Sequence, residues 1–179
     1  FLVGYEVSAV LGDQGFGVRM QRVGFHPTAV FGRLAAAAAT AALLGLDRQQ
    51  AAHALGLAGT SGGGLTASFG TMAKPYHSGK AAMDGVQAAE LAARGFEAAV
   101  GLFDGEGAFA DSFVQDSATR FDDLKFTAGQ SLFDNSFKPY ACGKLIHAHI
   151  DAARALRAAA AGRDIKKIRC SVAPHVKHL

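Results

Sequence analysis

The sequence is poor in cysteine and proline and has no tryptophan. Its 179 residues include four prolines and two cysteines, Cys142 and Cys170. Two cysteines that form no Cys-x-x-Cys pair are too few for a disulfide framework or a four-thiolate cluster, and no His-x-x-x-His ligand set is present. We therefore expect a protein of the reducing cytoplasm that has no metal site in this segment.

Charge is also scarce, at 18% of the residues. The formal net charge is +3 and the pI is about 9.0, but the basic residues are scattered, so nucleic-acid binding is not predicted. The longest apolar run, residues 34–46, is shorter than the roughly 20 residues that span a bilayer, and no signal peptide is visible. No membrane segment is predicted. Because the chain begins at Phe1 in a helical pattern, it is expected to be an internal fragment of a longer protein.

Helical periodicity is the main pattern in the chain. Apolar residues recur at helical spacing between N-terminal caps and glycine stops in five segments: 1–12, 27–44, 47–58, 78–94 and 144–161. A loop is predicted for residues 12–24. Residues 1–162 are therefore predicted to be part of an all-helical, bundle-type domain, and the fold class is mainly α.

The pattern changes near the C-terminal end. Residues 165–172 alternate apolar and polar side chains, which is typical of a strand. A second domain of the α+β class is therefore predicted to start at residue 163, so that residues 163–179 are its truncated beginning.

Three of the four prolines follow a cationic or potentially cationic residue: His26, Lys74 and Lys138. A cation at a helix N-terminus opposes the helix dipole unless an anion is shared with the free backbone N–H groups. Proline is expected to keep Lys74 extended, just before a helix that starts near Pro75 or Ser78. The pattern fits an anion site, but X-Pro steps also mark ordinary loop-to-helix junctions, and both interpretations remain open.

Four segments resemble the MmgE/PrpD family, in order and with family-like spacing. They are Gly4-Tyr5-Glu6-Val7, Gly24-Phe25-His26-Pro27-Thr28, Met72-Ala73-Lys74-Pro75-Tyr76-His77-Ser78-Gly79-Lys80-Ala81-Ala82 and Phe137-Lys138-Pro139-Tyr140-Ala141-Cys142-Gly143. The resemblance implies a large helical domain with a smaller α+β lid, in a homodimer that needs no metal or organic cofactor. It also implies that His26, Lys74 and Lys138 line the active site between the domains as catalytic residues.

The resemblance implies a lyase that acts on a small di- or tricarboxylate by dehydration or decarboxylation. Epimerisation or isomerisation of a dicarboxylate is the alternative within the family. Fixed cations suit such substrates because proton removal or CO₂ loss beside a carboxylate builds negative charge. Gly143 departs from the decarboxylase branch, which carries a histidine at this point of the motif. The fragment alone is expected to be inactive.

Two further residues are candidates for substrate binding. His77 faces the pocket or caps the following helix, and Tyr140 donates to a carboxylate or packs as an aromatic residue. His147 precedes Asp151 by four positions, so a structural pair on one helix face is expected.

Two different functions compete with the lyase. Residues 59–63 match the Gly-x-Ser-x-Gly pattern of a serine hydrolase, but this motif needs a preceding strand and residues 51–58 have a helical pattern. The other alternative is a non-catalytic helical interaction module.

Overall fold

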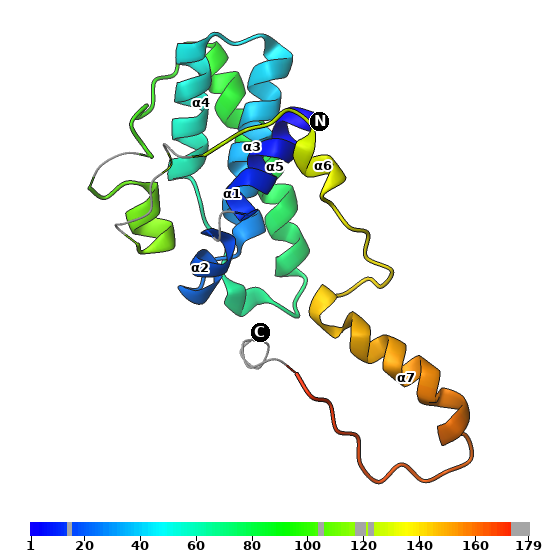
Figure 1. Cartoon of the computed structure of the whole chain (residues 1–179). Coiled ribbons are helices and arrows are strands. Elements are labelled where there is room, and N and C mark those ends of the chain that lie inside the picture. The colour runs from blue at the N-terminus through cyan, green and yellow to red at the C-terminus, as the bar shows by residue number, and fades with distance from the viewer. Residues whose placement is uncertain (14–15, 104–105, 117–120, 122–123, 173–179) are drawn as a thin grey trace. The chain divides into compact units, whose positions relative to one another are not determined.

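The computed structural model describes residues 1–13, 16–103, 106–116, 121 and 124–172, and these are mainly helical (Figure 1). The chain divides into two compact units, Phe1–Asp134 and Asn135–Leu179. Among the described residues the only β pairing is an isolated antiparallel bridge between Phe25 and Leu65. The predicted mainly α fold class is confirmed, whereas the predicted domain boundary at residue 163 stays a prediction.

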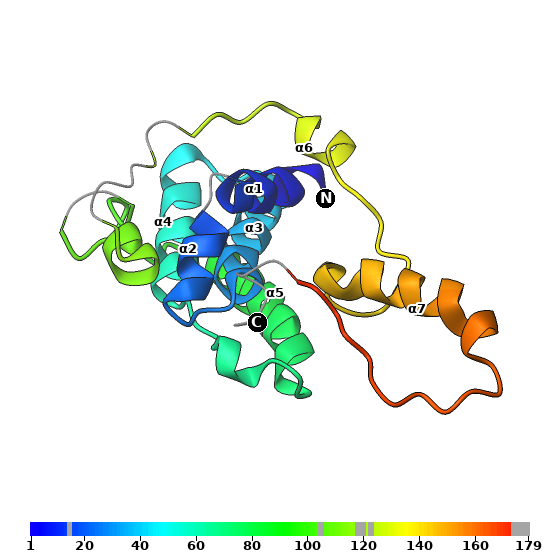
Figure 2. The same ribbon diagram turned by 60° about the horizontal axis from the view of Figure 1, so that its bottom comes forward.

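Helix α3 (Pro27–Leu44) is the centre of the first unit. It contacts α1 (Leu2–Asp13), α4 (Arg48–Thr60) and α5 (Ala73–Ala93), and α4 also contacts α5. The two views show these four helices gathered into one bundle, with α2 (Phe16–Arg22) at one end of it (Figures 1 and 2). The long alanine run in α3 permits this close packing because alanine side chains are small.

Local capping signals set the ends of the central helices. Pro27 occupies the first turn of α3, and Gly45 ends that helix in the left-handed conformation, with φ of 65°. Asp47 accepts a hydrogen bond from the Gln50 backbone N–H at 2.8 Å, while the Gln50 side chain accepts from the Asp47 N–H at 3.1 Å. This capping box confirms the predicted start of α4.

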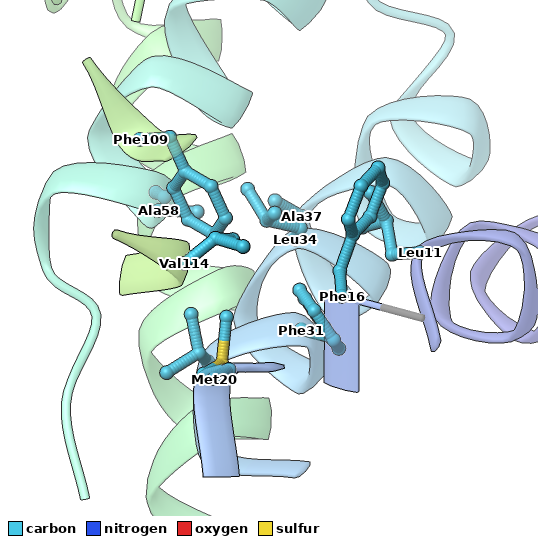
Figure 3. Close-up of a cluster of buried hydrophobic side chains, with 11 residues drawn as sticks. Leu11, Phe16, Met20, Phe31, Leu34, Ala37, Ala58, Phe109 and Val114 are labelled. Atoms are coloured by element: carbon cyan, nitrogen blue, oxygen red, sulfur yellow. The ribbon is translucent and has the colours of Figure 1, made fainter. Parts of the chain in front are cut away.

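The hydrophobic core lies where α2 and the turn η2 (Ala110–Val114) meet the bundle (Figure 3). Phe109, Met20, Leu34 and Val30 are its largest fully buried side chains. The loop predicted for residues 12–24 is therefore wrong over residues 16–22, which form α2. Phe16 and Met20 lie one turn apart and both enter the core, so tertiary packing outweighs the low helix propensity of the local glycines.

One described helix, α3, is long and apolar enough by length and composition to cross a membrane. The core helix of a soluble protein passes the same test, and α3 packs against four other helices of its unit, α1, α2, α4 and α5. The expected absence of a membrane segment stays a prediction.

Helices α3 and α5 approach closely at Gly85. A Cβ atom at this position would lie 2.5 Å from Ala36 Cβ and from the Arg33 carbonyl oxygen. We expect Gly85→Ala to lower the free energy of unfolding by about 2 kcal/mol, because the neighbouring atoms include helix backbone that cannot move alone. Denaturant unfolding of the protein expressed from its complete reading frame measures this loss.

Gly79 provides the matched control on the same helix. No described atom lies within 4 Å of a Cβ placed there, so Gly79→Ala is expected to be neutral or to stabilise by up to about 1 kcal/mol. Equal effects of the two substitutions would contradict the close approach at Gly85.

The second unit contains the turn η3 (Lys144–Ile146) and helix α7 (His147–Ala160), as predicted for residues 144–161. The strand predicted for residues 165–172 is wrong as a description of this structure, because these residues form neither helix nor strand. A strand requires ladder hydrogen bonds to a partner, and no described residue pairs with this segment in that way. The short helices η1 (Thr66–Ser68) and α6 (Gln130–Phe133) complete the described elements.

Candidate functional site

His26 lies at the N-terminus of α3, held against the loop that follows α4. Its backbone is extended, with ψ of 110°, and its N–H donates to the Gly64 carbonyl at 2.9 Å. The Thr66 N–H donates to the Gly24 carbonyl, also at 2.9 Å. These two bonds fix the segment before α3 alongside the glycine-rich loop, residues 61–64, and leave His26 only 7% exposed.

Lys74 and His77 come from the first turns of α5. This helix begins at Ala73, so Lys74 is helical and the prediction that it precedes the helix in an extended conformation is wrong. Proline lacks only an N–H that has no partner in the first helical turn, so Pro75 is accommodated there and the helix starts before it.

The two helix starts bring His26 and His77 into direct contact. Their Nδ1 atoms lie 3.1 Å apart, although the residues are separated by 51 positions. Phe69 packs its ring edge-on to His26, with centroids 4.9 Å apart, and Lys74 Nζ lies 4.3 Å from the centroid of the same phenyl ring. The His26 imidazole and the Lys74 ammonium group therefore both lie against Phe69, and the His77 imidazole lies against His26.

The electrostatics of this cluster favour a neutral His26. Burial lowers the pKa of His26 below its ordinary value, and the nearby His77 and Lys74 lower this pKa further. The positive end of α3 acts in the same direction because it disfavours a charged imidazole. His26 therefore stays neutral at pH values where an exposed histidine takes up a proton.

The glycine-rich loop needs Gly64 for a physical reason. Its φ is +103°, and an added Cβ would lie 2.6 Å from Ala29 Cβ and 3.2 Å from His77 Nδ1.

The alternative of a serine nucleophile in this region is wrong. Ser61 caps the end of α4, its hydroxyl donates to the Leu57 carbonyl at 2.8 Å, and the preceding segment is helix rather than strand.

A buried ion pair fixes α3 against α5 further along both helices from the imidazole pair. Arg33 Nε donates to Asp84 Oδ2 at 2.8 Å, and Lys80 binds the other carboxylate oxygen. Arg33 also donates to the carbonyls of Ala29 and Gly63, so it ties the glycine-rich loop to α3. Burial alone raises the pKa of Asp84, but the hydrogen bonds from Lys80 and Arg33 outweigh it and lower that pKa.

We expect Asp84→Asn to lower the free energy of unfolding by about 3 kcal/mol, because it leaves the Arg33 guanidinium buried without its anion. The Arg33 and Asp84 side chains are 8% and 10% exposed. Glu90→Gln is the control. Arg94 Nη1 lies 3.8 Å from Glu90 Oε2 and both side chains are more than half exposed, so the free energy of unfolding is expected to change by less than about 1 kcal/mol. Similar losses in the two variants would contradict the role of the buried pair.

Lys138 and Tyr140 lie in the second unit. Lys138 is exposed, and the Tyr140 hydroxyl donates to Asp151 and accepts from Arg154 Nη1 at 3.3 Å. The expected pair of His147 with Asp151 is wrong, because Tyr140 takes the carboxylate. The His147 ring packs edge-on to Tyr140. The convergence of Lys138 with His26 and Lys74 stays a prediction.

Sequence reasoning missed three contributors to the site: Phe69, Arg33 and Asp84. A signal for Arg33 was present, since it is a charge at the start of an alanine-rich helix expected to be buried, and such a charge needs a partner. Asp84 follows Lys80 by one helical turn. No group of three or more His, Cys, Asp or Glu side chains within the described part of the chain is placed to hold a metal ion.

A helical domain with two imidazoles and an amine at the first turns of two helices is suited to bind a small anion. The chain belongs to the MmgE/PrpD family: the MmgE/PrpD N-terminal domain matches residues 1–122. This match confirms the family indicated by the four sequence motifs.

Several relatives are cis-aconitate decarboxylases. The enzyme from Aspergillus terreus (strain NIH 2624 / FGSC A1156) is 33% identical over 164 residues, which cover 87% of this chain and 34% of that protein. The Mus musculus enzyme is 33% identical over 136 residues, covering 74% and 28%. The Homo sapiens enzyme is 39% identical over 85 residues, covering 48% and 18%. The chain thus spans about a third or less of the length of these relatives.

Proposed function

We propose that this chain is part of a lyase that acts on a small di- or tricarboxylate through proton transfer at a carbon beside a carboxylate. The observation that carries the proposal is the contact of His26 with His77 next to Lys74, at the N-terminal ends of α3 and α5. Family membership and the names of the relatives favour the same chemistry.

Lys74 and His26 are proposed to have different roles in this reaction. Lys74 binds a substrate carboxylate as a point charge. His26, which is neutral near physiological pH, exchanges a proton with the substrate as negative charge develops. Lys138 and Tyr140 are proposed to supply a second cation and a hydrogen-bond donor to the same substrate.

Dehydration and decarboxylation both fit this arrangement, since each builds negative charge beside a carboxylate. The relatives are named for decarboxylation of cis-aconitate, whereas Gly143 lacks the imidazole expected of the decarboxylase branch. Epimerisation of a dicarboxylate is the alternative within the same family.

A substrate panel with the protein expressed from its complete reading frame tests the proposal. cis-Aconitate, 2-methylcitrate, citrate and an iminodicarboxylate are supplied, and CO₂ release, alkene absorbance and loss of chirality are measured. Turnover of at least one tricarboxylate, with kcat/KM of about 10⁴ M⁻¹s⁻¹ or more, is the expected result. Absence of both turnover and binding across the panel would favour the non-catalytic helical module.

The proposal includes an enzyme that needs no metal or organic cofactor and that works as a homodimer. Activity retained after exhaustive chelation is the expected result for the first point. Loss of activity that one divalent ion restores would contradict it. Light scattering of the purified protein measures its oligomeric state.

A further inference from the structure

The contact between His26 and His77 restricts where protons can be. Two Nδ1 atoms 3.1 Å apart cannot both carry lone pairs, which repel, or both carry hydrogens, which collide. One Nδ1 therefore donates and the other accepts. In a neutral pair the donor ring has a lone pair on Nε2, while the acceptor ring carries its hydrogen on Nε2.

Burial decides which ring accepts when the pair carries one added proton. His26 is 7% exposed, whereas His77 is only partly buried, so the positive charge of the protonated pair costs less on His77. The proton between the rings therefore belongs to His77, whose Nδ1–H donates to His26 Nδ1. His26 is then a neutral imidazole with its hydrogen on Nε2, and neither Nε2 has a hydrogen-bond partner among the described residues.

The surroundings hold both rings in this arrangement. Phe69 packs edge-on to His26, and the Gly64 backbone lies against His77 so closely that an added Cβ would be 3.2 Å from the ring. Other charged groups packed near the pair are Lys74 on α5 and, further along both helices, Arg33 bonded to Asp84, which also binds Lys80. Lys74 and the two helix N-termini oppose a second proton on the pair.

We infer that His77 is a positioning residue that fixes His26 as the Nε2–H tautomer, so that His26 acts on the substrate as a neutral donor. This inference deepens the proposed function and rests on it for its catalytic consequence. In the proposed step, the Nε2–H proton passes from His26 to the developing carbanion or leaving hydroxyl. The step starts from the pair with its one added proton, so the shared Nδ1 proton moves from the protonated His77 ring to His26 and leaves both rings neutral, and solvent then returns one proton to the pair.

The first test reads the tautomer and needs no substrate. Protein with ¹⁵N-labelled histidine, expressed from its complete reading frame, is examined by NMR at neutral pH, and the His26 signal is assigned by its loss in His26→Ala. The wild type is expected to show hydrogen on Nε2 and none on Nδ1 of His26. His77→Phe is expected to give a mixture of tautomers, and His77→Asn to restore the wild-type form because its amide N–H replaces the Nδ1 donor.

The second test is kinetic. His77→Phe is expected to lower kcat by about 10-fold to 100-fold with little change in KM, on the scale of other partners that orient a catalytic imidazole, and His77→Asn to recover most of it. Tyr76→Phe, on the adjacent and exposed position of α5, is the control and should leave kcat unchanged.

Hydrogen on His26 Nδ1, or a tautomer that His77→Phe leaves unaltered, would overturn the inference. Wild-type kcat in His77→Phe would overturn it as well. If the wild-type protein turns over no carboxylate, the proposed function fails, while the NMR result still decides how the two rings share their proton.

Discussion

Replacing His26 with alanine is expected to lower kcat/KM by about 10³-fold, the middle of the range for loss of a proton-transferring side chain. The His26 side chain makes no capping hydrogen bond to α3, so its removal should spare the helix start. Steady-state kinetics with the substrate found in the panel measure the loss, and circular dichroism checks the fold. If kcat/KM of a folded His26→Ala variant falls by less than 10-fold, His26 is not a proton-transferring residue of the reaction.

The pH profile gives an independent signature of the same residue. Because burial, His77 and Lys74 lower the pKa of His26 from 6.5, the neutral ring persists below that pH. Wild-type kcat/KM is therefore expected to stay level as pH falls through 6.5 and to decline only at lower pH. Stability has the same sign of pH dependence: an unfolded chain binds this proton near pH 6.5, so the free energy of unfolding falls as pH drops from 6.5 to the lowered folded pKa of His26, and it stays at the reduced value below that pKa.

The sequence predicted the helices whose ends have local signals. Pro27, Gly45 and the Asp47 capping box each act within a few residues of the backbone that they terminate, so no tertiary knowledge is needed. Helix α2 could not be predicted in this way, because Phe16 and Met20 become buried only when η2 and the bundle assemble around them. The predicted strand at residues 165–172 failed for the related reason that a strand depends on its partner.

The candidate site shows the same division between local and tertiary causes. The X-Pro pattern selected His26 and Lys74 without the fold, because a cation at a helix start is a local anomaly. The contact between His26 and His77 requires that α3 and α5 pack side by side, which Gly85 and the Arg33–Asp84 pair make possible. Periodicity places these residues on helices but does not tell which helices meet. Sequence therefore indicated the residue types of the site, while their pairing came from the structure.

The position of Lys74 explains why its charge is suited to binding a ligand rather than to supporting the fold. Its Nζ makes no ion pair with any described residue and lies over the Phe69 ring, 4.3 Å from the centroid. A cation–π contact of this kind leaves the remaining ammonium hydrogens available to an anion. The nearby Lys80 differs, since it is engaged by Asp84.

We therefore expect Lys74→Ala to lower kcat/KM by about 10²-fold or more, the scale seen when a charge partner of the transition state is lost. Lys138→Ala is expected to cost a similar factor if both lysines bind the same polycarboxylate. Lys74→Arg should retain part of the activity, because it keeps the charge but changes its geometry.

The control for Lys74→Ala is Lys125→Ala, at an exposed lysine of the same unit, which should leave kcat/KM within about 2-fold because an exposed charge is screened by solvent and salt. Unfolding measurements should also distinguish Lys80 from Lys74. Lys80→Ala removes an ion pair with Asp84 and is expected to lower the free energy of unfolding. Lys74→Ala removes no ion pair with a described residue and is not expected to lower it in this way. If Lys74→Ala and Lys138→Ala both turn over tricarboxylates at the wild-type rate, the lysines do not bind substrate, even though the helical fold and the imidazole pair stand.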